Sequence, residues 1–247
     1  MRTRQDRIAH ELREAITSGE YPPGSMLPAL PELIAQYGVA RDTVRGAIST
    51  LANEGLVVPQ SGVGTVVRDT SPVNLNSSLG NPHPVWSATA GEDGATVIAE
   101  AEWVQAGPEL TERLAVATGE DLVRRVKIYY KGRHVALTHE QWIPSAVARA
   151  IAEHLGYDAA DKSSAEPSDL YTMMRGVGFT PSSTTETVTA RMPDPDEREV
   201  MGIPAGIPVL LTERVTNDPD GRPLETSDFA GPADRTAQTY TVAIPSP

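Results

Sequence analysis

Residues 32–57 read ELIAQYGVARDTVRGAISTLANEGLV, and two helices can be recognised in them. The spacing of the apolar residues in the second half predicts a helix over 41–54 with one buried face, formed by Val44, Ala47, Ile48 and Leu51. A shorter helix is expected over 31–37, with Pro31 in its first turn and Gly38 in the left-handed conformation after it. Two helices joined by a glycine-containing turn predict a helix-turn-helix.

The residues on either side of this stretch predict one more helix and a β-hairpin. Apolar residues recur at helical spacing over 4–19, ahead of a proline-rich connector. Residues 56–67 have β-rich ends around a glycine-containing centre, which is typical of a hairpin. The N-terminal region over 1–69 is therefore expected to be a winged helix-turn-helix.

The rest of the chain is expected to form a second domain behind a linker. Residues 70–86 are rich in Pro, Ser and Asn and poor in apolar side chains, which is typical of a linker. Beyond them, β-branched runs alternate with turn signals and helical segments, at 96–104, 122–130, 135–142, 184–190 and 209–216. The domain over 87–247 is therefore expected to be α+β with a mainly antiparallel sheet.

Composition excludes several function classes. The chain has no cysteine and its five histidines never fall at metal-ligand spacing, so we expect no disulfide, metal or other cofactor. A formal net charge of −12 argues against non-specific coating of nucleic acid. The sequence has no long apolar segment, which predicts a cytoplasmic protein without a membrane partner.

Both halves of the chain resemble known families. LREAITSGEYPPGSMLP, the helix-turn-helix stretch and SGVGTVV resemble the GntR family of bacterial regulators. MGIPAGIPVLLTERVTNDPDGRPLETS, with LVRRVKI, ALTHEQWIP and SDLYTMM, resembles the UTRA ligand-sensing domain of the HutC subfamily, which is related in fold to chorismate lyase. The resemblance implies a transcription regulator whose partners are operator DNA, a small-molecule effector and a second copy of the chain.

The residues expected to contact DNA lie in the second helix and the hairpin. The N-terminal end of a recognition helix faces base edges in the major groove, which selects Arg41, Asp42, Thr43 and Arg45. The two arginines are the expected readers because a guanidinium can bond both acceptors of guanine. At the hairpin, backbone approach or phosphate contact is expected from Ser61, Gly62 and Gly64, although plain hairpin geometry explains the glycines almost as well.

Two features predict weak attraction to DNA phosphates. Members of the family usually carry a DNA-contacting arginine where this chain has Pro31, and Ala29 and Ala40 also depart from the family pattern. In residues 1–69, seven basic residues are offset by eight acidic ones. Affinity is therefore expected to depend on dimerisation.

The candidates for effector binding lie in the second domain. Arg125 and Lys127 alternate along a strand, share one face and suit a carboxylate, phosphate or sulfate. The resemblance adds further candidates, namely Glu140, Ser168, Tyr171, Arg191, Arg214 and Glu225. An equally weighted alternative is that Arg125 pairs with Glu140, and Arg214 with Glu225, as structural cross-strand pairs.

Two other functions were weighed against regulation by an effector. An enzyme could use Arg125 and Glu140 to hold a carboxylate and move a proton, but a fused helix-turn-helix and the lack of a recognisable nucleophile and base argue against it. A regulator that responds to a partner protein is the third possibility. The sequence favours a homodimeric repressor released from a palindromic operator by a small anion.

Overall fold

A computed structural model describes residues 3–69, 73–76, 94–132, 134–164, 169–204 and 206–240. Contacts divide the chain into two compact units, Met1–Pro72 with Met192–Pro208, and Val73–Arg191 with Val209–Pro247. The second domain expected over 87–247 includes residues 192–208, whereas the contacts of this segment group it with the N-terminal unit. One such contact joins the buried Ile207 to Gly55: a Cβ atom added to Gly55 would lie 2.6 Å from the Cδ1 atom of Ile207.

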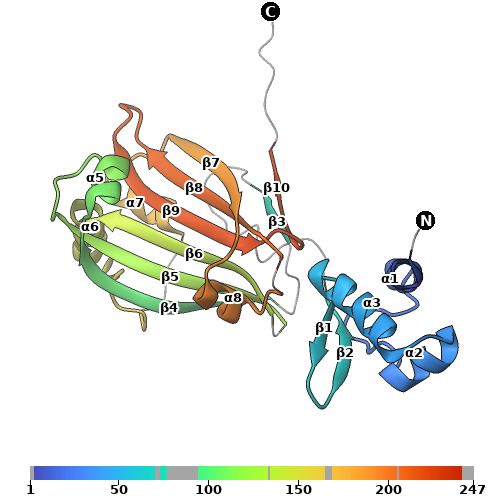
Figure 1. Cartoon of the computed structure of the whole chain (residues 1–247). Helices are drawn as coiled ribbons and strands as arrows, with labels where there is room; N and C mark the ends of the chain where they lie inside the picture. Colours follow the sequence, from blue (N-terminus) through green and yellow to red (C-terminus); the bar gives the residue numbers. More distant parts are fainter. Residues whose placement is uncertain are drawn as a thin grey trace, which may run out of the picture. The chain divides into compact units, whose positions relative to one another are not determined.

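The N-terminal unit contains the predicted winged helix-turn-helix (Figure 1). Its helices are α1 (Arg4–Thr17), α2 (Leu30–Tyr37) and α3 (Arg41–Asn53), and its hairpin pairs β1 (Val57–Gln60) with β2 (Gly64–Val67). The predicted apolar face of α3 is buried in one core with α1 and α2, in which the central side chains are Ile8, Leu12, Leu33, Val44 and Leu51. Burial of these faces stabilises helices that would be marginal in isolation.

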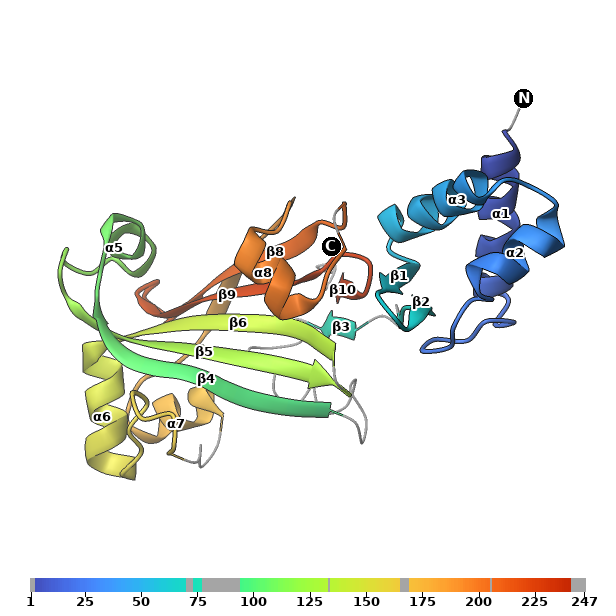
Figure 2. The same cartoon turned by 60° about the horizontal axis from the view of Figure 1, so that its bottom comes forward.

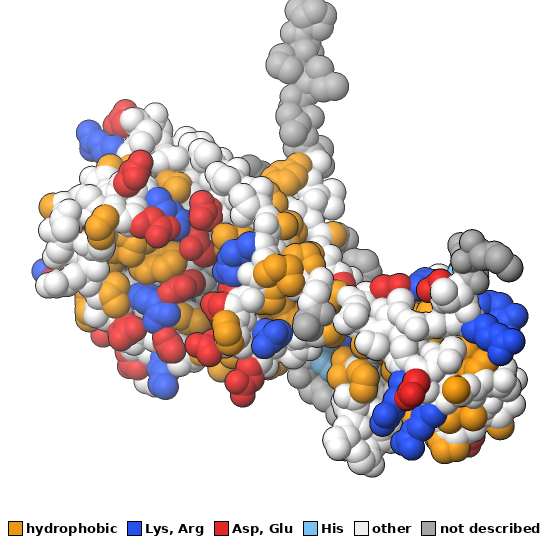
Figure 3. All heavy atoms as spheres, viewed as in Figure 1, with side chains coloured by type: hydrophobic (Ala, Val, Ile, Leu, Met, Phe, Trp, Pro, Cys, Tyr) orange, Lys and Arg blue, Asp and Glu red, His pale blue; other side chains and the backbone are white. Residues whose placement is uncertain are grey.

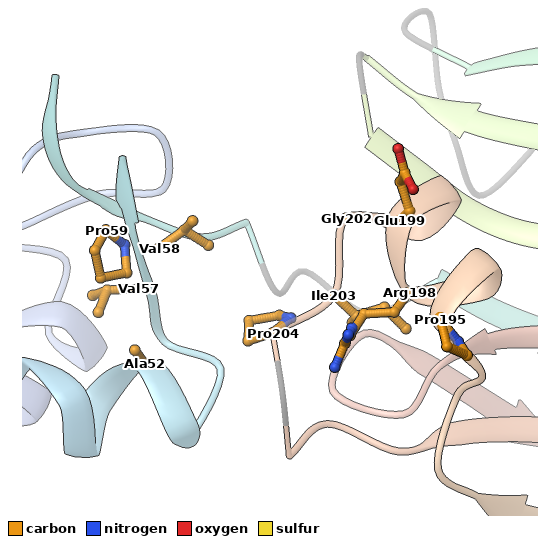
Figure 4. A pocket seen from close by; sticks show the side chains of 10 residues that line it. All are labelled: Ala52, Val57, Val58, Pro59, Pro195, Arg198, Glu199, Gly202, Ile203 and Pro204. Atoms are coloured by element: carbon orange, nitrogen blue, oxygen red, sulfur yellow. The ribbon is translucent and has the colours of Figure 1, made fainter. Parts of the chain in front are cut away.

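The segment Met192–Pro208 carries α8 (Pro195–Met201). Asp194 accepts a hydrogen bond from the backbone of Glu197, and the Glu197 side chain accepts one in return, so a capping box begins the helix. Figure 4 shows the side chains that line a hollow formed by α3, β1 and this segment. Its lining is largely apolar, and none of the predicted site residues belongs to it.

The C-terminal unit is built on a six-stranded sheet in the order β4-β5-β6-β9-β8-β7, in which all neighbours are antiparallel (Figure 1). The strands are β4 (Gly94–Gln105), β5 (Asp121–Lys131), β6 (His134–Pro144), β7 (Ser183–Arg191), β8 (Val209–Asn217) and β9 (Pro223–Pro232). Five of them match predicted runs, and β9 follows the turn at Asp218–Gly221. The sheet confirms the predicted α+β fold with antiparallel pairing.

Helices cover the sheet unequally (Figure 2). α6 (Ser145–Leu155) and α7 (Leu170–Gly176) pack against Val123 and Ile143 on the face that we call the inner face. The short helix α5 (Pro108–Leu114) packs on the opposite, outer face, where Leu114 contacts the apolar cluster around Leu122. Because side chains alternate along a strand, each strand contributes every second residue to the inner face.

Part of the predicted linker is a strand. Within 70–86, the described residues Val73–Asn76 form β3, which pairs in parallel with β10 (Thr236–Thr239). A strand can form in this apolar-poor segment because strand pairing uses backbone hydrogen bonds and does not require apolar side chains. Among the described residues, no helix is long and apolar enough to cross a membrane.

Candidate DNA interface and effector site

The N-terminal end of α3 presents the predicted DNA readers. Arg41, Asp42 and Arg45 are exposed, and Thr43 is half-buried. Val44, Ala47 and Ile48 anchor the opposite face of the helix in the core, which leaves the arginines free to point outward. Ala40 has no side-chain oxygen to cap α3, so its first-turn amides remain suited to a phosphate oxygen.

The hairpin brings its tip near the same helix. Ser61, Gly62 and Gly64 are exposed, and the two glycines have φ angles of 76° and 138°, which disfavour any other residue. Arg45 and Gly64 line one hollow together with Ser49 and Thr65. The structure therefore places the recognition helix and the hairpin tip around one concave surface.

Other basic residues of this unit have structural partners. Arg13 forms an ion pair of 2.5 Å with Glu54, and buried Arg68 donates a 2.7 Å hydrogen bond to the carbonyl of Gly55. Figure 3 shows basic side chains on the visible face of the unit, with acidic ones among them. These pairings leave fewer arginines for DNA phosphates than the sequence count suggests.

A polar row crosses the inner face of the C-terminal sheet. Strand register aligns five residues across five strands, namely Arg125, Gln141, Ser227, Arg214 and Glu186. Arg125 is fully buried, and its guanidinium lies 5.6 Å from the ring of Tyr157. Charged residues are seldom fully buried, so two arginines and a glutamate in one row are unusual for a sheet that packs against helices.

Glu225 is the hub of the hydrogen bonds beside this row. Its Oε1 accepts from Tyr171 at 3.1 Å and Thr216 at 2.6 Å, and its Oε2 accepts from Ser227 at 2.6 Å and Gln141 at 3.2 Å. Burial and the Glu225 charge raise the pKa of Tyr171, which therefore stays protonated and able to donate. A carboxylate has about four acceptor sites, and protein donors occupy all four. Glu225 thus fixes the positions of the polar side chains around it, and its contact with an effector stays a prediction.

Arg214 pairs with Glu186 and not with Glu225 as the sequence alternative proposed. Its Nε donates to Glu186 Oε1 at 2.7 Å, and its guanidinium lies 4.8 Å from the ring of Phe229. The register explains the difference, because Glu186 on β7 is directly opposite Arg214 whereas Glu225 is opposite Thr216. The pair is buried on both sides.

The neighbouring row contains a histidine that the sequence analysis did not select. His139 lies opposite Lys127 and is stacked on Phe229, with ring centroids 4.2 Å apart. Burial lowers the pKa of His139 well below its ordinary value, and the charges of Lys127, Arg214 and Arg125 lower it further. The imidazole is therefore neutral.

Glu140 and Arg191 do not join the other effector candidates. Glu140 lies on the outer face and forms an ion pair with Arg124, so the proposed pairing of Glu140 with Arg125 is wrong by one residue. Arg191 is exposed at the end of β7 and lies on the opposite face of this strand from Glu186. A shift of one residue moves a side chain to the opposite face of a sheet.

The structure therefore brings five of the predicted effector residues to one face, namely Arg125, Lys127, Tyr171, Arg214 and Glu225. Ser168 lies outside the described residues. His139 and Gln141 were missed, because alternation counted from the β5–β6 turn pairs Arg125 with Glu140. A register irregularity at Tyr129 and Tyr130, which the sequence does not reveal, shifts that count.

Comparisons with known proteins agree with both units. Residues 4–67 match the model of the bacterial regulatory proteins of the gntR family, and residues 89–237 match the UTRA domain. The regulator GgaR of Escherichia coli is 29% identical over 90% of this chain and 84% of its own length. The histidine utilization repressor of Pseudomonas aeruginosa is 26% identical over 85% of this chain and 80% of its own length.

A solved structure of a GntR-family transcriptional regulator is 26% identical, covers 99% of both chains and has a TM-score of 0.61. These relatives are transcriptional regulators, in agreement with the prediction that the chain is not an enzyme. The chain belongs to the UTRA-domain family and is a transcriptional regulator with the helix-turn-helix of the gntR family.

Proposed function

We propose that the protein is a homodimeric, cytoplasmic repressor that leaves a palindromic operator when a small anion binds the inner face of its C-terminal sheet. The observation that carries the proposal is the fully buried Arg125 beside the buried Lys127, in a chain whose other unit presents Arg41 and Arg45 at a recognition helix. Buried cations suit an anionic ligand because attraction between opposite charges is stronger in a medium of low dielectric constant. The printed name of one relative, a histidine utilization repressor, supports the repressor role.

Dimerisation follows from the weak basic character of the DNA-binding unit. Two copies would place two recognition helices on half-sites about one helical turn apart, so that two-fold protein symmetry matches a palindrome. Release requires that the anion bind the non-binding arrangement more tightly, with a coupling free energy of about 1–3 kcal/mol. The segment 70–86 remains the proposed connection between the DNA-binding domain over 1–69 and the effector domain over 87–247.

Fluorescence anisotropy tests DNA recognition. The full-length protein is titrated against a palindromic fragment of its own promoter, alongside Arg45→Ala and the control Arg149→Ala, an exposed arginine of α6. Loss of one guanidinium contact to guanine should weaken binding by roughly 5- to 100-fold, while the control binds normally. Equal affinity for all three proteins would contradict the assignment of Arg45.

Two further measurements complete the test. Light scattering during size-exclusion chromatography should give twice the chain mass of 26.4 kDa. Addition of a panel of anionic metabolites to the DNA complex should identify one that lowers the anisotropy, and Lys127→Met should blunt that response. Activation of transcription by the unliganded protein in a reporter assay would overturn the repressor role.

A further inference from the structure

The buried carboxylates of the inner face already have their partners, and this limits which side chains can recognise a ligand. Glu225 accepts four hydrogen bonds from protein donors. Glu186 binds Arg214 through Oε1, accepts from Gln238 through Oε2 at 2.9 Å and is also bonded by Tyr240. A ligand would have to displace a protein donor to reach either carboxylate.

His139 and Gln141, in contrast, keep unsatisfied polar atoms. Among the described residues, neither ring nitrogen of His139 nor the Oε1 of Gln141 has a hydrogen-bond partner, although both side chains are at least nine-tenths buried. Buried polar groups in native proteins are nearly always hydrogen-bonded, so these atoms are among those on this face that can bond a ligand without displacing a protein donor. The two residues lie on one strand, two positions apart, and therefore on the same face.

Both residues are directly opposite the cations of the proposed effector site. Gln141 pairs with Arg125 and His139 pairs with Lys127 across β5 and β6. Directly opposed residues have Cβ atoms about 5 Å apart, so an anion held by the cations would place its substituents beside His139 and Gln141. Stacking on Phe229, with the ring planes 16° apart, fixes the direction of the imidazole.

We propose that His139 and Gln141 orient the effector, and that the effector is an anion that also carries a hydrogen-bond donor such as a hydroxyl or amino group. This inference rests on the proposed anion site. The Oε1 of Gln141 can only accept a hydrogen bond, and a neutral imidazole offers one donor and one acceptor. A bare anion supplies acceptors alone and would leave Gln141 unsatisfied.

Isothermal titration of the full-length protein with matched anions tests the inference. Glycerol 3-phosphate is compared with propyl phosphate, and glycerate with propionate, because each pair differs in its hydroxyl groups. The hydroxylated member of at least one pair should bind the wild type at least about tenfold more tightly, since its partner leaves a buried acceptor unmet.

Variants assign that preference to the two side chains. His139→Phe keeps the stacking on Phe229 and removes both ring nitrogens. Gln141→Met removes Oε1 at similar volume, together with the Nε2 that donates to Glu225. Each variant should lower the ratio of the affinities for the hydroxylated and the unhydroxylated anion toward unity. Glu140→Gln, a neighbour on the outer face, should behave as the wild type.

The outcomes separate this inference from the proposed function. Equal binding of both members of a pair would overturn the hydroxyl requirement and leave the anion site standing. If no anion binds at millimolar concentration while operator binding is intact, the anionic effector and this inference both fail. Should His139→Phe not fold, ring nitrogen resonances of the wild-type histidines provide the readout: His139 should shift with the hydroxylated anion, and no shift on binding would refute its role.

Discussion

Removal of Glu186 should destabilise the C-terminal unit, because it leaves the buried positive charge of Arg214 without its ion-pair partner. The side chains of Glu186 and Arg214 are 7% and 8% exposed, and an Arg214 Nη2 lies 2.5 Å from Glu186 Oε1. Burial by itself lowers the pKa of Arg214, but Glu186 and the neighbouring Tyr171 and Glu225 raise it above its ordinary value. The guanidinium therefore stays charged when Glu186 is lost.

The expected cost of Glu186→Ala is about 3 kcal/mol in the free energy of unfolding. Breaking a buried ion pair by removing one partner costs roughly 3–5 kcal/mol, and the lower end applies because Glu186 lies on the edge strand β7, where water can approach. An exposed pair gives the matched control: Arg149 and Asp121 are 67% and 51% exposed and 3.3 Å apart. Arg149→Ala should change the free energy by no more than about 0.5 kcal/mol.

Urea unfolding followed by tryptophan fluorescence reports on the C-terminal unit, because Trp103 and Trp142 belong to its strands β4 and β6. The double variant Glu186→Ala/Arg214→Met should recover most of the loss, because it also removes the guanidinium that the single variant leaves without its ion-pair partner. A free energy for Glu186→Ala as close to the wild type as that of Arg149→Ala would refute the reasoning. So would a double variant no more stable than the single one.

Three further predictions concern stability. Gly46→Ala in α3 should raise the stability of the N-terminal unit by about 0.5–1 kcal/mol, because the nearest atoms to the new Cβ belong to the movable end of Gln5. Thermal melts followed by circular dichroism measure this change, and a lower melting temperature would mean that Gln5 cannot move. Gly38→Ala should lower the stability of this unit by about 1 kcal/mol, and Gly38→Asn by less, because φ is +61° at the end of α2; equal effects of Ala and Asn would contradict this cause. The pKa of His139 is depressed in the folded protein, so the unfolded chain binds one more proton at low pH. The free energy of unfolding should therefore fall as the pH drops below about 6.5, by up to about 1.4 kcal/mol per pH unit. Urea unfolding of His139→Gln should show a weaker dependence of this free energy on pH, and an unchanged dependence would show that another group titrates.

Local signals in the sequence determined the DNA-binding unit. The apolar face of α3, the turn at Gly38 and the hairpin around Gly62 depend on residues close in the chain, so helical period, capping and turn chemistry predict them. The strands of the second unit were predictable for the same reason, since alternation and turn residues mark each one. The side chain of Arg125 was assigned to the correct strand face on this basis.

Tertiary structure alone decided which strand residues meet. The partners of Arg125, Arg214 and Glu225 depend on the pairing register between strands, and an irregularity at Tyr129 and Tyr130 moves the β5–β6 register by one residue. Such a shift exchanges the faces of a strand, which is why Glu140 lies on the outer face and His139 on the inner face. Periodicity along one strand specifies a face, but only pairing between strands specifies the neighbours on that face, because cross-strand contacts are set by the backbone hydrogen bonds that join the strands.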